Sequence, residues 1–287
     1  MILGRKVIIG IHGLDNKPEP AVLSAWWKAA IEEGIARHGG GRRPKVRFEL
    51  VYWADLVYSE PSDPASLADP YMPAQGEGPL PRGGLSVRGL TAARVREGAG
   101  RVLAKVVKAP LAENRFKDAL WTRMPDLHSY REDESLRQAV QERLIKRLRA
   151  AHRWRRQVML IAHSMGSIIA YDVLREAGRT LPRLRLAHLV TLGSPLGLGE
   201  FGDIVERPLH VPECVERWTN FADPKDQVAR WDAFLSEDCL PNSKGVTISD
   251  RLVVNSYVNP AGVPNPHKVY GYLRTPEMSE LIAEFAR

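Results

Sequence analysis

One five-residue stretch has the composition of a nucleophilic serine turn. Ser164 sits in the sequence AHSMG (162–166), which follows the apolar run at 158–161 and precedes small and apolar residues of helical character. In a nucleophile elbow, a serine occupies a strained turn between a strand and a helix. The residues two before and two after it must then be small, as Ala162 and Gly166 are. We therefore expect Ser164 to be a nucleophile; the alternative is an incidental serine in a strand-to-helix loop.

A serine hydroxyl needs a histidine base, and the base needs a group that orients it. On strand–turn–helix scaffolds these groups arrive in the order Ser, Asp or Glu, His, each in a loop after a strand. Of the eight histidines, three follow Ser164, namely His188, His210 and His267. His188 falls inside a predicted strand and His210 precedes the acidic loop, so we predict that His267 is the base. His163, beside the serine, is expected to shape the site.

Two aspartates follow the predicted strand at 214–221, and either one has the right place in the order to orient the base. Asp226 is preferred because Val228, two residues later, is an apolar residue able to anchor the loop. Asp223 precedes Pro224, and this pair is typical of a turn. The sequence therefore predicts Asp226 as the acid and leaves Asp223 as the alternative.

A second stretch has the residues of an oxyanion hole. His12 and Gly13 directly follow the predicted strand at 6–11. Glycine lets the backbone approach a reacting group closely, and backbone N–H groups at such positions stabilise a developing negative charge. We predict that the N–H groups of Leu14 and Met165 are these donors and that His12 shapes the site. The alternative is an ordinary turn that ends the strand.

The elements that would hold these residues alternate between strands and helices. Such alternation predicts an α/β fold with a mostly parallel central sheet and helices on both faces, here as a single domain over 1–287. The predicted strands are 6–11, 46–53, 158–161, 184–192, 214–221 and 246–255. The predicted helices are 21–37, 132–154 and 276–287.

Residues 55–130 differ in composition, with many prolines and glycines in the first half. Such a stretch does not form a regular core element, and we interpret it as a lid or cap insertion within the domain. Apolar residues between 95 and 107 line one side of a predicted helix that also carries basic residues. That helix either packs on its own domain, the favoured interpretation, or contacts an anionic membrane surface.

Composition restricts the partners and the compartment. The chain of 287 residues is 44% hydrophobic and carries a formal charge of +7. The basic charge favours anionic partners, but a solvated helix face explains the basic end of the helix at 132–154, so nucleic acid is an unfavoured partner. Two cysteines form no disulfide framework and no metal-ligand spacing, and no metal or organic cofactor is expected. Without a signal peptide or a long apolar run, the sequence predicts a cytoplasmic protein.

Taken together, these stretches resemble the α/β-hydrolase superfamily, and more narrowly its lipase- and esterase-like branch with an intracellular, lidded architecture. The matching stretches are IHGL (11–14), AHSMG (162–166), LGSP (192–195), NFADPKDQVA (220–229) and NPHKVYGYL (265–273). The resemblance implies hydrolysis of a small-molecule or lipid ester by Ser164, Asp226 and His267, without a cofactor. Ala162 departs from the usual first glycine of the elbow.

The resemblance leaves other functions open. A thioesterase, an amidase and an acyltransferase use the same triad. A non-catalytic binding or scaffold protein can keep the fold and the residues, because fold alone does not fix function.

Overall fold

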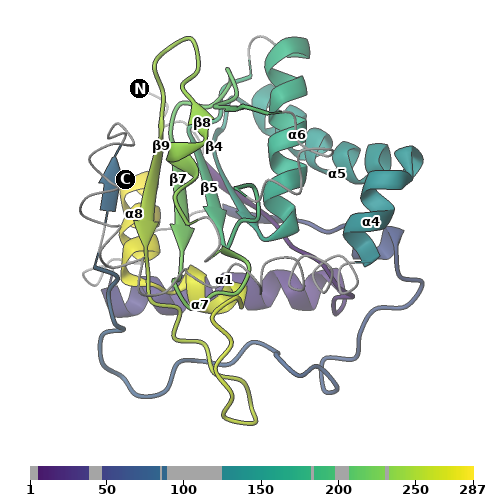
Figure 1. The fold of residues 1–287 in the computed structure, drawn as a ribbon. Coiled ribbons are helices and arrows are strands. Elements are labelled where there is room, and N and C mark those ends of the chain that lie inside the picture. Colours follow the sequence, from purple (N-terminus) through teal and green to yellow (C-terminus); the bar gives the residue numbers. More distant parts are fainter. Residues whose placement is uncertain are drawn as a thin grey trace, which may run out of the picture.

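Six parallel strands form the centre of the structure, and a seventh joins them antiparallel at one edge (Figure 1). The computed structural model describes residues 6–38, 47–84, 86–88, 125–181, 184–197, 207–229 and 233–287. The strand order is β2-β1-β4-β5-β7-β9-β3. These strands are β1 (Lys6–Ile11), β2 (Arg47–Val51), β3 (Ser86–Arg88), β4 (Gln157–His163), β5 (His188–Leu192), β7 (Trp218–Ala222) and β9 (Ile248–Leu252).

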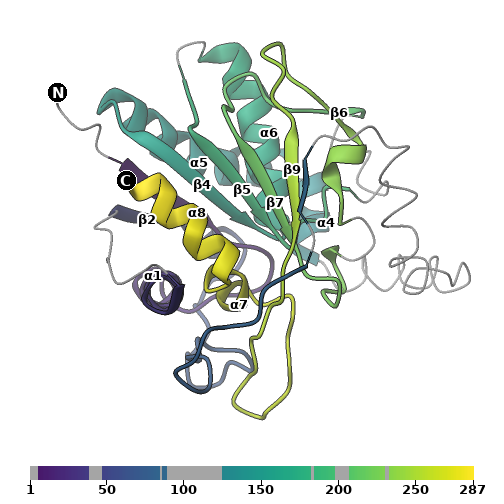
Figure 2. The same ribbon diagram turned by 90° about the vertical axis from the view of Figure 1, so that its left-hand side faces the viewer.

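Helices cover both faces of this sheet. Helices α1, α7 and α8 lie on one face, and α5 and α6 lie on the other (Figure 2). The helices are α1 (Pro20–His38), α4 (Pro125–Glu132), α5 (Glu134–Arg153), α6 (Met165–Thr180), α7 (Val269–Leu273) and α8 (Pro276–Ala286). Short elements complete the description: the 3₁₀ turns η1 (Ala54–Leu56) and η4 (Leu235–Glu237), and a small two-stranded sheet of β6 (Leu209–His210) and β8 (Cys239–Leu240).

The core is divided by the sheet because side chains alternate along each strand. In β1, Val7, Ile9 and Ile11 pack with the helices α5 and α6, whereas Ile8 packs with α1 and α8. Both faces of the strand are buried, which explains why its sequence is a continuous apolar run instead of an alternating one.

The helices that pack on the sheet begin where the sequence supplies a cap. The Asp133 carboxylate accepts a hydrogen bond from the Leu136 N–H at the start of α5, which then buries residues four apart, Val140, Leu144 and Leu148. The Thr275 side chain caps α8 in the same way. Such caps satisfy N–H groups that the helix itself leaves without partners.

The α/β class and the mostly parallel sheet agree with the sequence prediction, and each strand and helix predicted within the described residues is present. The boundaries differ most at β5 and β7, which begin four residues later than expected. There, Leu186 and Val215 form only an isolated bridge. The sequence did not predict α7, whose five residues are all buried.

The segment 55–130 is more closely built into the domain than its composition suggests. Its residues 86–88 form β3, which pairs with β9 at the edge of the main sheet. Helix α4 closes the segment and buries Leu127 and Tyr130 against the core. The sequence did not predict these two elements, whereas the Pro- and Gly-rich span at 61–84 forms no helix or strand, as its composition indicates. The helix predicted around 95–107 lies outside the described residues.

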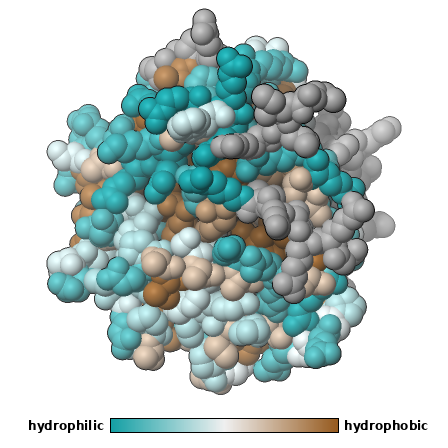
Figure 3. All heavy atoms as spheres, turned by 180° about the vertical axis from the view of Figure 1, so that it is seen from behind, coloured by the Kyte–Doolittle hydropathy of each residue, from teal (hydrophilic) through white to brown (hydrophobic). Residues whose placement is uncertain are grey.

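On the rear face, hydrophobic side chains show in the middle of the view and at scattered places among hydrophilic ones (Figure 3). Among the described residues, the large apolar side chains that stand exposed are Trp154, Leu240 and Val263. No helix in the described part of the chain is long and apolar enough to cross a bilayer.

Candidate active site

The predicted serine turn lies where the strand order of the sheet reverses. Strand β1 is flanked by β2 on one side and β4 on the other, so the loops that follow β1 and β4 meet at a topological switch point. Ligands of open α/β sheets bind in the crevice at such points, beyond the carboxyl ends of the strands. Gly13 follows β1 and Ser164 follows β4, and both line one cavity here.

Ser164 has the strained backbone of a nucleophile elbow, with φ 53° and ψ −129°. A non-glycine residue in a sparsely populated region costs about 1–3 kcal/mol and persists only where its surroundings enforce it. Its N–H donates to the Leu192 carbonyl at 3.0 Å, and its carbonyl accepts from the Ser167 hydroxyl at 2.6 Å. A side chain at Gly166 would place Cβ 2.7 Å from the carbonyl oxygen of Ile11, so only glycine fits there.

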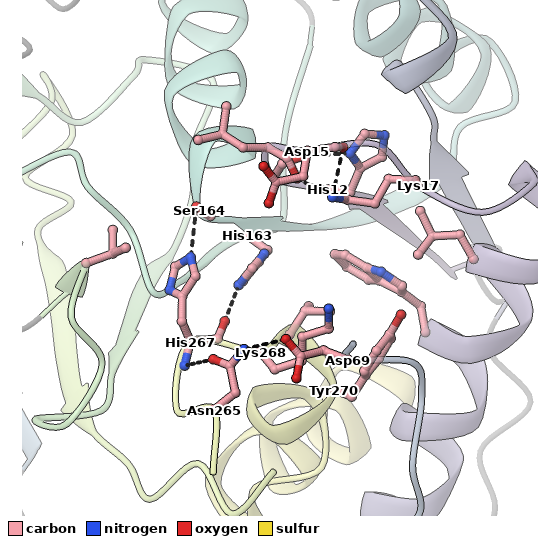
Figure 4. A pocket seen from close by; sticks show the side chains of 16 residues that line it. His12, Asp15, Lys17, Asp69, His163, Ser164, Asn265, His267, Lys268 and Tyr270 are labelled. Atoms are coloured by element: carbon pink, nitrogen blue, oxygen red, sulfur yellow. Dashed lines mark hydrogen bonds between the residues drawn. The ribbon is translucent and has the colours of Figure 1, made fainter. Parts of the chain in front are cut away.

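The structure brings the serine, the histidine and one aspartate into a continuous hydrogen-bonded chain. The distance from Ser164 Oγ to His267 Nε2 is 3.0 Å (Figure 4). The distances from His267 Nδ1 to the two carboxylate oxygens of Asp226 are both 2.9 Å. A carboxylate accepts hydrogen bonds, so the Nδ1 atom of neutral His267 carries the proton and Nε2 is left to accept from the serine hydroxyl. This is the tautomer that a general base needs.

Asp226 is held as a carboxylate by the groups around it. Burial by itself would raise its pKa, but the His267 ring, the Tyr272 hydroxyl and the Val228 N–H together bring the pKa below its usual value. The Tyr272 hydroxyl donates to Oδ2 at 2.6 Å and the Val228 N–H donates to Oδ1 at 2.8 Å. Hydrogen bonds to the charged form favour that form. Val228 thus holds the loop through its backbone N–H.

The alternative acid, Asp223, faces other partners. Its carboxylate accepts from the Lys225 N–H at 2.7 Å and from the Asn255 N–H at 2.5 Å. The bond from Asn255 connects the loop after β7 to the segment after β9. Within the described residues, Asp223 has no hydrogen bond to His267. It stabilises the loop that carries Asp226.

A glycine between the acid and the base makes room for both. Gly193 has φ +54°, and a Cβ there would lie 2.7 Å from Asp226 Oδ2 and 3.1 Å from His267 Nδ1. Left-handed backbone is tolerated by glycine at little cost. The position therefore requires glycine for both its conformation and its space.

His12 orients the first predicted oxyanion donor. The Trp53 N–H donates to His12 Nε2 at 3.0 Å, so the proton of the neutral ring is on Nδ1, which donates to the Gly13 carbonyl at 2.8 Å. Burial, aided by the charge of Lys17, lowers the pKa of His12 to about 3 and keeps it neutral. In a trans peptide the C=O and the N–H point in opposite directions, so the bond to Gly13 also directs the Leu14 N–H.

The second predicted donor belongs to the first residue of α6. The N–H groups of a helix's first turn have no partner within the helix, and Met165 holds such a position. Neither the Leu14 N–H nor the Met165 N–H donates a hydrogen bond to another residue of the described ranges. Gly13 allows the two turns to approach, because a Cβ there would lie 2.8 Å from Ser164 Cβ. The arrangement leaves both donors available to a substrate oxygen beside the serine.

His163 holds the loop that carries the base. Its Nε2–H donates to the His267 carbonyl at 2.7 Å, and the two rings lie 4.8 Å apart. Burial, followed by the nearby His267, lowers the pKa of His163 well below its usual value. As expected from the sequence, His163 shapes the site while another histidine contacts the serine.

One cavity of about 270 Å³ is lined by Ser164, His267, His12 and His163. The residues that line it come from the loop after β1, from α1, from the segment after η1 and from the loop that carries His267 (Figure 4). Its polar lining includes Asp15, Lys17, Asp69, Asn265 and Lys268. Its apolar lining is formed by Leu14, Leu23, Trp27, Val228, Val269 and Tyr270. The volume is slightly below the range of about 300–1,000 Å³ that is usual for drug-sized ligands.

No protein-family model matches the chain, and no curated protein matches it. In the part of the chain that the structure describes, no cluster of three or more His, Cys, Asp and Glu side chains is arranged to hold a metal ion.

Sequence reasoning missed several residues that shape this site. Gly193 and Tyr272 fall inside the stretches LGSP and NPHKVYGYL, but nothing local to those stretches shows that they contact Asp226. Lys268 is adjacent to the predicted base, and that position was a usable signal. Lys17 and Trp27 reach the cavity only because α1 packs beside β1, which requires the fold.

Proposed function

We propose that this protein is a serine hydrolase of the α/β-hydrolase type that cleaves carboxylic esters. The observation that carries the proposal is the 3.0 Å contact between Ser164 Oγ and His267 Nε2, made by a serine in a strained elbow. An adjacent base that is itself oriented by a carboxylate is the arrangement that activates a serine. The chain order Ser164, Asp226, His267 also matches that of this superfamily.

The reaction would proceed in two stages. In the first, Ser164 Oγ attacks the ester carbonyl carbon while its proton passes to His267 Nε2, and Asp226 stabilises the imidazolium. His267 then protonates the leaving alcohol, which departs and leaves an acyl-enzyme. In the second stage, water gives its proton to His267 and attacks the acyl carbon, and Ser164 recovers its proton as the acid leaves.

The N–H groups of Leu14 and Met165 would stabilise the oxyanion of both tetrahedral intermediates. One such donor is worth about 3–4 kcal/mol in comparable sites. The strain at Ser164 and the close approach at Gly13 support this role, because they bring the two turns together at the serine.

The cavity of about 270 Å³ has room for a short acyl group and a small alcohol, which supports a small-molecule ester as the substrate. We keep residues 55–130 as a lid in this proposal, since Asp69 of that segment lines the cavity. A thioesterase, amidase or acyltransferase would use the same groups, and a substrate panel with competing nucleophiles distinguishes these reactions.

Hydrolysis of 4-nitrophenyl acetate by purified variants tests the proposal. Ser164→Ala and His267→Gln should each lower kcat by about 10⁴-fold or more, with unchanged circular dichroism. A Ser164→Ala protein that keeps wild-type turnover would reject the assignment. A folded wild-type protein that turns over no ester, thioester or amide would favour a non-catalytic binding protein.

A further inference from the structure

The cavity beside Ser164 contains a cationic group that the proposed chemistry does not use. The Lys268 side chain lines it, and Figure 4 shows the amino groups of Lys17 and Lys268 directed into the same space from different sides. Within the described residues, the Lys268 ammonium forms no hydrogen bond and no ion pair. It makes a cation–π contact with the Tyr270 ring, whose centroid is 5.7 Å from the Lys268 Nζ atom. Burial lowers the pKa of Lys268, although Asp69 and Asp15 partly oppose that shift.

Lys17 adds positive charge and is partly occupied. Its ammonium donates to the carbonyls of Leu14 and Asp15, which also supports the predicted oxyanion loop. Burial lowers the pKa of Lys17 to about 8, so the group is still mostly protonated at neutral pH. The cavity therefore presents two ammonium groups, both of them hydrogen-bond donors.

The carboxylates of the lining limit the charge that the cavity accepts. Asp69 accepts a hydrogen bond from the Asn265 amide at 2.9 Å, and Asp15 is exposed to solvent. Neither pairs with Lys268, but both would repel a dianion more than a monoanion. A carboxylate therefore fits the donors better than a phosphate does.

We propose that the substrate ester carries a carboxylate close to its scissile bond, and that Lys268 binds this carboxylate. This inference rests on the proposed hydrolase function and names the class of substrate for the same serine. Lysine paired with a carboxylate forms a charge-assisted hydrogen bond, which is stronger than a neutral one. The cavity of about 270 Å³ has room for a short half-ester.

Two esters of equal chain length test the inference, 4-nitrophenyl hemisuccinate and 4-nitrophenyl butyrate. The wild-type kcat/KM should be at least about tenfold higher for the hemisuccinate. Lys268→Met should reduce this preference about tenfold, chiefly through the KM of the hemisuccinate. Lys28→Met is the matched control, because Lys28 lies on the surface of α1 with its side chain 60% exposed, and it should keep the wild-type preference.

The outcomes separate the inference from the function on which it rests. Hydrolysis of both esters with equal kcat/KM would overturn the carboxylate site and leave the hydrolase intact. A preference for the 3-phosphonopropionate ester over the hemisuccinate would overturn the inference that the cavity binds a carboxylate better than a doubly charged group. If no ester is hydrolysed, the hydrolase proposal fails, and monomethyl succinate then tests the site by thermal shift. A rise in Tm for the wild type but not for Lys268→Met would support an anion site, and no rise for either would overturn it.

Discussion

A methyl group at Gly193 should damage the site through the acid and the base at once. The ideal Cβ of Gly193→Ala lies 2.7 Å from Asp226 Oδ2, whereas ordinary van der Waals contact begins at 3.4 Å, so the two atoms overlap by 3.4 − 2.7 = 0.7 Å. The same Cβ would lie 3.1 Å from His267 Nδ1, which is also closer than an ordinary contact. Relief therefore requires a shift of Asp226 or His267 by several tenths of an ångström.

The size of the effect follows from that shift. A misplacement of about 1 Å at a reacting group can lower the rate about 10²-fold, so Gly193→Ala should lower kcat/KM about 10- to 100-fold. The alanine must also adopt φ +54°, which costs roughly 1–2 kcal/mol for a residue with a side chain. We expect the free energy of unfolding to fall by about 1–3 kcal/mol, with the fold retained.

Ester hydrolysis and urea unfolding of the same preparations provide the assay. Gly178→Ala in α6 is the matched control, because its added Cβ meets nothing closer than 3.6 Å. This control should keep wild-type kcat/KM and gain up to about 1 kcal/mol of stability, since alanine is the better helix former. Wild-type kcat/KM in a folded Gly193→Ala protein would refute the geometric reasoning about the acid and the base.

Two further predictions concern the acid and the pH dependence of stability. Asp226→Asn should lower kcat about 10⁴-fold in the same ester assay, whereas Asp223→Asn should lower Tm and keep kcat within about tenfold; equal losses of kcat would contradict the assignment. Burial lowers the pKa of His188 to about 3, so the unfolded chain binds this proton first as the pH falls below 6.5, and folded-state stability declines from there toward pH 3. Between pH 7 and pH 5 the loss from this residue should be about 2 kcal/mol, and urea titrations of His188→Gln should show a pH dependence that is smaller by that amount; an unchanged dependence would count against a neutral buried His188.

Much of the fold was predictable because its core elements carry strong local signals. The apolar run of β1 and the four-residue spacing of α5 identify those elements without any tertiary information. Strand β3 has only three residues, and it is a strand because β9 offers an edge to pair with. Helix α7 has the sequence VYGYL, which favours a strand by propensity, yet it is helical in the folded protein and completely buried. Tertiary packing overrides propensity in such short elements.

The candidate site was predictable to the extent that chain order restricts it. The AHSMG motif was enough to choose Ser164, and chain order with strand ends was enough to choose His267, because few histidines satisfied both conditions. The choice between Asp223 and Asp226 depends on which carboxylate faces the base, and that is decided by backbone donors in a loop of a few residues. Gly193 acts through neighbours that are distant in sequence, and a local pattern does not show such contacts.

The most direct test of the central claim is the intact mass of the protein after treatment with a fluorophosphonate probe. Ser279 is a fully buried serine on α8 that does not line the cavity, so Ser279→Ala is the matched control for Ser164→Ala. An activated nucleophile at Ser164 predicts a single adduct on the wild type and on Ser279→Ala, and no adduct on Ser164→Ala. An adduct that persists on Ser164→Ala, or a folded wild-type protein that forms none, would contradict the account.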